Sequence, residues 1–298
     1  MRTERLTVAR DIELAVDRWP PTGAETRRPS ATSGDHVPAS VPFLLVHGLA
    51  SNARMWDGVA VRLAASGHEA ITVDLRGHAR SSKPDGPYDI PAVAADLATL
   101  IERLSLDRPV VAGQSWGGNV VLELAATRPE LVTAIVLVDG GWLDPSRWFP
   151  DWESCRAALA PPRLVGRPLR EVEGFLRSAH ADWPETGIRG ALANFEVRED
   201  GTIAPWLTFD RHIAVLRGLW EHHPAARYGS VTVPVLLVPA DGDDHERLDR
   251  KRQEVSEAAA ALPDAQVHWI AGDHDIHAQR PDELAAVMLE SLREEVAG

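Results

Sequence analysis

Residues 113–117 read Gly-Gln-Ser-Trp-Gly and place one hydroxyl between two glycines. The apolar run Val110–Ala112 leads into this segment, and a run with helical spacing starts at Trp116. A sharp turn from a strand into a helix lifts a serine hydroxyl above a sheet, and flanking glycines leave room for that turn. The pattern therefore predicts that Ser115 is a nucleophile.

A serine hydroxyl is a weak nucleophile at neutral pH, so Ser115 needs a base. His274 is the expected base, because it ends the loop Ala271-Gly272-Asp273-His274 directly after the apolar run Val267–Ile270. The carboxyl ends of parallel strands meet at one edge of a sheet, which would bring His274 to Ser115. His277 is the alternative base.

A carboxylate must fix the tautomer of such a base and stabilise its protonated form. The apolar run Val235–Val238 is followed by Pro239-Ala240-Asp241-Gly242-Asp243-Asp244, which offers three carboxylates at a strand end. We expect Asp243 to be the partner of the base, with Asp241 and Asp244 as alternatives.

Asp139 is a fourth candidate acid, because it directly follows the apolar run Leu131–Val138. The favoured set has the chain order Ser115, Asp243, His274. This is the order of hydrolases that carry a nucleophile elbow.

The tetrahedral intermediate of acyl transfer needs two hydrogen-bond donors for its oxyanion. The backbone N–H of Trp116, directly after the nucleophile, is one expected donor. The loop His47-Gly48-Leu49-Ala50 follows the apolar run 43–46, and the N–H of Leu49 is the other expected donor. His47 is expected to brace this loop rather than to take part in the chemistry.

Short apolar runs alternate along the chain with amphipathic runs, which predicts a mostly parallel sheet with helices on both faces. Two alternating runs within residues 4–19 predict an opening hairpin. Residues 20–40 are rich in Pro, Gly, Ser, Thr and charge, and we expect a mobile loop there. The predicted strands and helices are, in chain order, strand 43–46, helix 55–65, strand 70–73, helix 90–104, strand 109–112, helix 116–127, strand 131–138, strand 235–238, helix 246–262, strand 267–270 and helix 282–296.

The segment 140–228 interrupts this alternation and predicts an inserted helical cap, or lid, with helices near 167–180, 186–196 and 206–221. The core would then be residues 1–139 and 229–298. Aromatic side chains supply a large apolar area together with an N–H donor, so the cap favours an apolar or aromatic substrate. The cap contains six of the ten tryptophans, and these are the tentative pocket residues: Trp142, Trp148, Trp152, Trp183, Trp206 and Trp220.

Composition excludes several classes of protein. The 298 residues carry 31 Lys and Arg against 44 Asp and Glu, a net charge of −13, which argues against binding to nucleic acid or to an anionic membrane. A single cysteine, Cys155, excludes a cysteine-based zinc site, and no other metal or organic cofactor is expected. The first twenty residues lack an apolar signal segment, which predicts a cytoplasmic protein.

Taken together, the chain resembles the α/β-hydrolase family, in the subgroup that has a serine nucleophile and a helical cap. The resemblance covers most of residues 40–298. It departs from the family at Ala240 and Ala79, where glycine is common. The matching motifs occur in the family's order: His47-Gly48, Asp74-Leu75-Arg76-Gly77-His78-Ala79-Arg80-Ser81, Gly113–Gly118, Asp243 and Gly272-Asp273-His274.

This resemblance implies an α/β-hydrolase fold and a carboxylesterase-like or lactonase-like enzyme that acts on a small molecule. Haloalkane dehalogenases and epoxide hydrolases have a similar elbow with aspartate as the nucleophile, so Ser115 argues against both activities. The alternatives are a carbon–carbon bond hydrolase, an aminopeptidase of the same fold, and a non-catalytic ligand-binding member. The sequence leaves the oligomeric state open.

Overall fold

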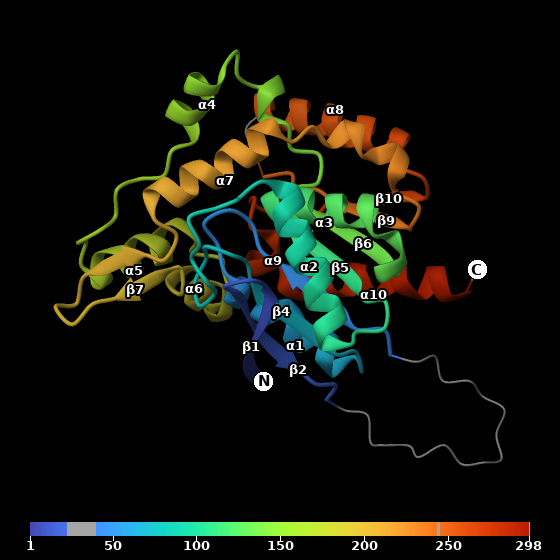
Figure 1. The fold of residues 1–298 in the computed structure, drawn as a ribbon, viewed down its shortest axis with the longest axis horizontal. Helices are drawn as coiled ribbons and strands as arrows, with labels where there is room; N and C mark the ends of the chain where they lie inside the picture. Colours follow the sequence, from blue (N-terminus) through green and yellow to red (C-terminus); the bar gives the residue numbers. More distant parts are fainter. Residues whose placement is uncertain (23–39, 243–244, 298) are drawn as a thin grey trace.

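A computed structural model describes residues 1–22, 40–242 and 245–297, and these form an eight-stranded sheet flanked by helices (Figure 1). The strand order is β1-β2-β4-β3-β5-β6-β9-β10. Strands β3 to β10 of this sheet run parallel, whereas β2 is antiparallel to both β1 and β4. The strands are β1 (Arg2–Ala9), β2 (Ile12–Trp19), β3 (Phe43–Val46), β4 (Ala70–Asp74), β5 (Val110–Gln114), β6 (Ala134–Val138), β9 (Val235–Val238) and β10 (Ala265–Val267).

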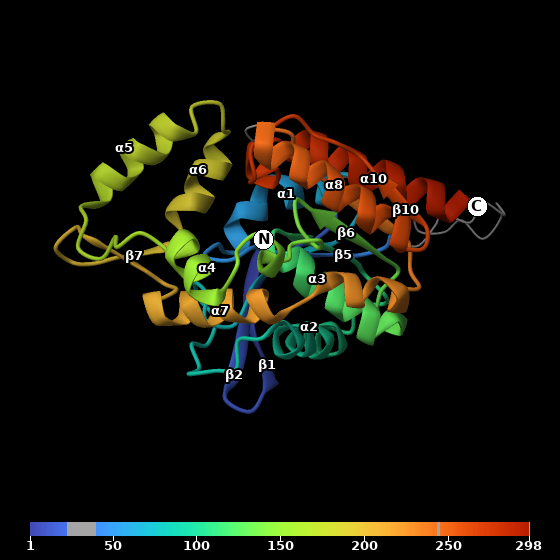
Figure 2. The same ribbon diagram turned by 90° about the horizontal axis from the view of Figure 1, so that it is seen from above.

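Helices cover both faces of the sheet, which confirms the predicted fold class. Figure 2 shows α1 and α10 on one side of the strands and α2 and α3 on the other. Helix α8 joins the face of α2 and α3 through its buried residues Val255 and Ala258. The helices of the core are α1 (Asp57–Ala65), α2 (Ile90–Leu104), α3 (Trp116–Thr127), α8 (His245–Ala261), α9 (Ile276–Gln279) and α10 (Pro281–Ala297).

The predicted helix 90–104 is observed with the same bounds, and its local causes are visible. The Asp89 side chain caps the helix by accepting a hydrogen bond from the Ala92 N–H at 2.9 Å, and Pro91 stands in the first turn. The helix ends at Ser105, which adopts a left-handed conformation.

Residues 140–228 lie between β6 and β9, so their insertion leaves the sheet intact. Figure 1 shows their elements gathered beside and above one end of the sheet. They comprise α4 (Trp152–Leu159), α5 (Leu169–Ala179), α6 (Glu185–Leu192), α7 (Phe209–Glu221) and the hairpin of β7 (Phe195–Val197) with β8 (Ile203–Pro205).

The described structure corrects some predicted bounds. The strand expected from Leu131 begins at Ala134, because Pro129–Leu131 forms a 3₁₀ turn. The strand expected at 267–270 lies at Ala265–Val267, and Ile270 makes only an isolated bridge to Ala240. Residues 23–39, most of the expected loop 20–40, lie outside the described residues.

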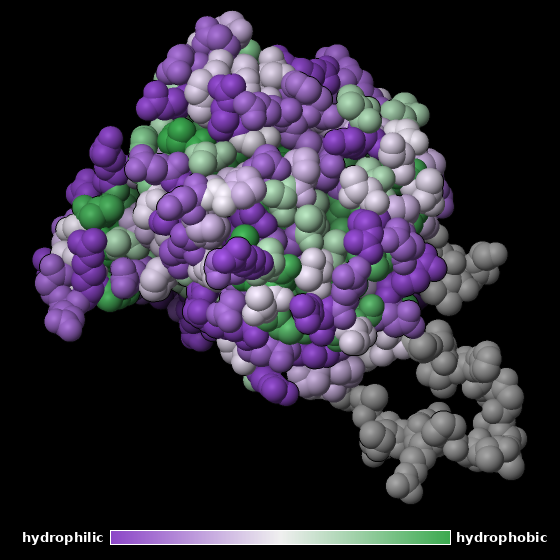
Figure 3. Space-filling view, viewed as in Figure 1, coloured by the Kyte–Doolittle hydropathy of each residue, from purple (hydrophilic) through white to green (hydrophobic). Residues whose placement is uncertain are grey.

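The outer surface is mostly hydrophilic on the face that Figure 3 shows, where hydrophobic residues form small patches between charged ones. None of the described helices has both the length and the apolar character for crossing a membrane.

Candidate active site

Ser115 stands at the turn from β5 into α3, with φ 54° and ψ −125°. This backbone conformation is costly for a residue with a side chain, and such strain concentrates at functional sites. Its N–H donates to the Val138 carbonyl at 2.9 Å, which fixes the turn to β6. A Cβ at Gly113 would collide with the Gly117 carbonyl, and one at Gly117 with the His47 carbonyl. The turn therefore requires both glycines.

The His274 ring and the Asp139 carboxylate are directly bonded, with 2.6 Å between Nδ1 and Oδ2. Asp139 directly follows β6, is 2% exposed, and also accepts a hydrogen bond from the Ala240 N–H at 3.0 Å. His274 comes from the loop after β10, so the sheet topology brings together two residues that are far apart in the chain.

The carboxylate bonded to His274 is therefore that of Asp139, the alternative acid, while the role expected of Asp243 stays a prediction. Asp241 is exposed, while Asp243 and Asp244 lie outside the described residues. The carboxyl end of β6 is beside that of β9, so either strand end could have supplied the acid. Only the bonded geometry distinguishes them.

Each member of this pair changes the protonation of the other. The surrounding protein disfavours the charged imidazole, but the hydrogen bond and negative charge of Asp139 outweigh this effect and raise the pKa of His274 above 6.5. Burial opposes ionisation of Asp139, but the bond to His274 and the charges of His274 and Lys251 hold the pKa of Asp139 below 3.8. The pair therefore has an ionised carboxylate and a readily protonated imidazole.

Ser115 and His274 line the same two cavities, and the Gln114 side chain donates to the His274 carbonyl at 3.0 Å. Among the hydrogen bonds of the described residues, none joins the Ser115 hydroxyl to the imidazole. Catalytic hydrogen bonds are often loose without substrate and tighten only in the complex. The backbone thus brings the candidate nucleophile and the candidate base to the same cavities.

The two expected oxyanion donors also lie here, since Leu49 and Trp116 line the larger of these cavities with Ser115. Within the described part of the chain, neither backbone N–H donates a hydrogen bond to another residue. Both N–H groups can therefore serve a ligand.

Two buried imidazoles fasten the loop that carries Leu49. His47 Nε2 accepts from the Leu75 N–H at 3.0 Å, so its Nδ1 carries the proton and donates to the Gly48 carbonyl at 2.7 Å. His78 Nε2 accepts from the Ala50 N–H at 3.3 Å. Burial lowers the pKa of His47 to about 4 and of His78 to about 3. Both rings are neutral braces, as expected for His47.

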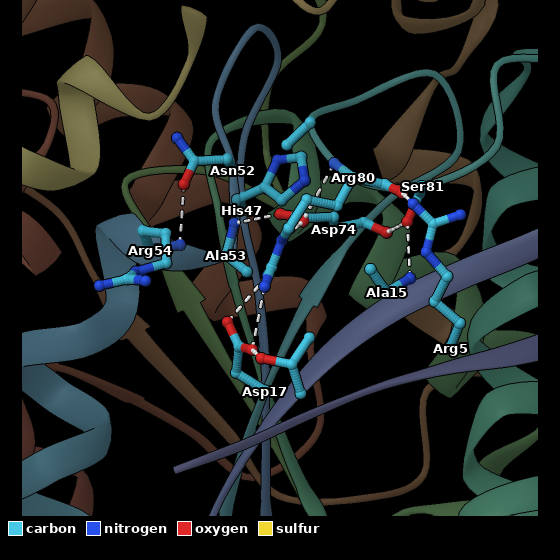
Figure 4. Close-up of polar contacts among 12 residues, drawn as sticks. Arg5, Ala15, Asp17, His47, Asn52, Ala53, Arg54, Asp74, Arg80 and Ser81 are labelled. Carbon is cyan, nitrogen blue, oxygen red and sulfur yellow. Dashed lines mark hydrogen bonds and ion pairs between the residues drawn. The ribbon is translucent and has the colours of Figure 1, made fainter. Parts of the chain in front are cut away.

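An ion-pair network supports the same loop from the strand side (Figure 4). Arg80 donates to Asp74 at 2.7 Å and to both carboxylate oxygens of Asp17 at 2.8 and 3.0 Å. The other oxygen of Asp74 accepts from the Ala53 N–H at 2.7 Å. The motif 74–81 therefore connects β2, β4 and the segment after the loop that carries Leu49.

Two cavities contain Ser115, and a third shares lining residues with both of them. One of about 800 Å³ and one of about 220 Å³ both contain Leu49, Ser115 and His274. A third, of about 750 Å³, shares Asn194 and Phe195 with the smaller one. His212 of α7 lines both large cavities, and no sequence pattern indicated this residue.

The six expected pocket tryptophans divide into two groups. Trp142 and Trp148 line the largest cavity, Trp183 the smallest and Trp206 the third. Trp152 and Trp220 instead pack edge to face against each other, with 6.1 Å between ring centroids.

His277 does not face the cavities that contain Ser115. It is fully buried in α9 against Trp56, and burial lowers its pKa to about 3. Lys251 of α8 does lie at the site, where it bonds Asp139, and the sequence reasoning missed it. Its position could not be read from the chain, because it depends on how α8 packs.

Comparisons with known proteins agree with this fold. The family model described as alpha/beta hydrolase fold matches residues 41–281. A 2-(acetamidomethylene)succinate hydrolase of Mesorhizobium japonicum is 28% identical over 66% of this chain and 69% of its own length. Esterase YbfF of Escherichia coli is 26% identical over 81% of this chain and 89% of its own length. The solved structure of an E-2-(acetamidomethylene)succinate hydrolase superposes with a TM-score of 0.75 at 23% identity, covering 97% of this chain and 98% of that one.

Proposed function

Because the chain belongs to the alpha/beta hydrolase fold family and is a hydrolase, we propose that it cleaves a carboxylic ester or lactone of a small, apolar or aromatic substrate through an acyl-enzyme. One observation carries this proposal. A serine in a strained elbow shares its cavity with an imidazole that is bonded to a buried carboxylate. These are the groups that nucleophilic acyl transfer requires.

In the proposed reaction, His274 takes the proton of Ser115 as its oxygen attacks the substrate carbonyl. The N–H groups of Leu49 and Trp116 hold the resulting oxyanion. His274 then gives the proton to the leaving alkoxide, and water attacks the acyl-enzyme with His274 as base. Asp139 keeps Nδ1 protonated, so that Nε2 is the nitrogen that accepts the proton.

The substrate class follows from the walls of the cavities. We propose that residues 140–228 act as a cap, which supplies Trp142, Trp148, Leu143 and Phe149 to the largest cavity. A cavity of about 800 Å³ with such side chains suits a ligand of drug size that buries apolar surface. The similarity to an esterase over most of both chains supports the ester assignment.

A second candidate is hydrolysis of a substrate that carries a carboxylate. Arg247, Arg250 and Lys251 line the same cavity, and one relative is named for a succinate derivative. Carbon–carbon and aminoacyl bonds are the further alternatives for the same nucleophile.

Ser115→Ala tests the proposal. We expect the variant to fold normally and to lose p-nitrophenyl butyrate turnover by at least about 10⁴-fold. A fluorophosphonate should label wild-type Ser115, as mapped by mass spectrometry. The matched control is Ser51→Ala, because Ser51 lines the smaller cavity together with Ser115 but lies outside the elbow, and this variant should still be labelled.

Unchanged turnover in Ser115→Ala would reject the mechanism. Ligand binding without turnover or labelling in the wild type would identify a non-catalytic member. A parallel screen of an ester, a vinylogous diketone and an aminoacyl anilide would identify the bond.

A further inference from the structure

Lys251 makes an unusual set of contacts for a residue of a surface helix. Its Nζ lies 2.9 Å from Oδ1 and 3.0 Å from Oδ2 of Asp139, and 2.9 Å from the Ala240 carbonyl. The side chain is only 13% exposed and lines the cavity that contains Ser115. The ammonium group therefore bridges the ends of β6 and β9 at the candidate acid.

One carboxylate oxygen of Asp139 contacts both His274 and Lys251. Oδ2 of Asp139 is bonded to Nδ1 of His274 at 2.6 Å and to Nζ of Lys251 at 3.0 Å. A buried carboxylate with an imidazole as its only partner would strongly favour the protonated imidazole, which cannot act as a base. The positive charge of Lys251, bonded to the same oxygen, makes the protonated imidazole less favourable.

We propose that Lys251 is a positioning residue for the candidate acid: it fixes both oxygens of Asp139 and keeps the carboxylate ionised while His274 is neutral. This inference rests on the proposed function. It assigns Lys251 no contact with the reacting atoms, because its role is exerted through Asp139.

Other charged or titratable groups also surround His274, and within the described part of the chain no hydrogen bond or ion pair joins them to Oδ2 of Asp139. They come from its own loop, from α9, from the loop after β3, from the inserted segment and from α8. The groups are Asp273, Asp275, His277, His47, His180, His212, Glu246, Arg247, Arg250 and Glu254. A variant of Lys251 leaves all of them in place.

Lys251→Met should raise the midpoint of the acidic limb of kcat/KM by about one pH unit, because loss of the ammonium charge strengthens the hold of Asp139 on the His274 proton. Lys251→Arg keeps the charge and should keep the wild-type midpoint. The control is Arg252→Met, which removes a positive charge from the same helix where the side chain is 57% exposed and pairs only with Asp249 among its described salt bridges. It should not shift the midpoint.

The His274 imidazole should also be titrated by NMR in wild type and in Lys251→Met, since this readout needs no turnover. An upward shift of its pKa in the variant supports the inference. If Lys251→Met does not fold, Lys251→Gln provides the uncharged comparison with an amide that can still bond Asp139 and Ala240.

An unchanged midpoint in a folded, uncharged variant would overturn the inference, as would an equal shift in Lys251→Arg. These outcomes concern only Lys251. Failure of the proposed function would instead be seen as Ser115→Ala turnover equal to that of the wild type.

Discussion

The Ala240 N–H donates a hydrogen bond to Oδ1 of Asp139 at 3.0 Å and so connects the ends of β9 and β6. Ala240 belongs to the loop in which the acid was expected. In the structure this loop supplies a donor, and the carboxylate comes from the neighbouring strand.

Asp139→Asn should therefore lower kcat by about 10³- to 10⁴-fold, because the amide cannot fix the imidazole tautomer or stabilise the imidazolium. Asp243→Asn is the matched variant and should retain activity close to that of the wild type. Steady-state kinetics on p-nitrophenyl butyrate decides whether Asp139 or Asp243 is the acid. A large loss in Asp243→Asn with little loss in Asp139→Asn would restore the original assignment.

The pH dependence of activity should follow His274. Only neutral His274 can take the Ser115 proton, so kcat/KM should rise with pH as the ring deprotonates. Asp139 raises the pKa of His274, which places the expected midpoint above 6.5. Asp139→Asn removes the two largest effects that raise this pKa, while desolvation and the charge of Lys251 still lower it, so the midpoint of the residual activity should fall below that of the wild type. A midpoint that stays constant in this variant would contradict the assignment of the base.

Arg80→Met should destabilise the fold by about 3 kcal/mol, since it leaves two buried carboxylates without their cation. The side chains of Asp17 and Asp74 are both 0% exposed. Urea unfolding measures the loss, and adding Asp17→Asn to Arg80→Met should restore part of it. Arg128→Met is the control, because Arg128 pairs with exposed glutamates, and it should cost less than about 1 kcal/mol. Equal losses in the two arginine variants would argue against the network.

Trp148→Leu and Trp152→Leu should separate substrate contact from packing. Trp148 lines the cavity with Ser115, so its loss should raise KM for an aromatic ester by about tenfold. Trp152 packs on Trp220, so its loss should lower the melting temperature and leave KM unchanged. Kinetics and thermal melts on both variants provide the test. The opposite pattern would mean that the cavity near Trp148 does not hold the substrate.

The sequence predicted the sheet and its flanking helices well, because apolar periodicity and local caps determine them. The strand Val235–Val238 and the helix Trp116–Thr127 have their predicted bounds. The hairpin of β7 and β8 was missed, since three-residue strands carry too little pattern. The predicted helix 186–196 ends at Leu192, and Asn194 just beyond it accepts a hydrogen bond from Asn52 at 2.6 Å, a contact that no local pattern shows.

From the sequence, the residues of the candidate site could be placed only at the ends of predicted strands. Ser115 and His274 each lie in a loop with few competitors. For the acid, residues after β6 and after β9 are equivalent in the sequence, and the choice depends on side-chain directions at two adjacent strands. The placement of Lys251 depends on how α8 packs over the ends of β6 and β9.

The neutral His47 and His78, which hold the loop that carries Leu49, have a consequence for the stability of the protein in acid. The rings of His47 and His78 are 4.8 Å apart and closed to solvent, so a proton on either would place an unmatched charge in the core. Unfolding frees both rings to bind protons, so folding stability should fall as the pH drops from about 6.5 toward 4. The buried His277, whose pKa is also lowered to about 3, adds to this effect, so side chains closed to the solvent would limit stability in acid, at a pH lower than the expected midpoint of activity.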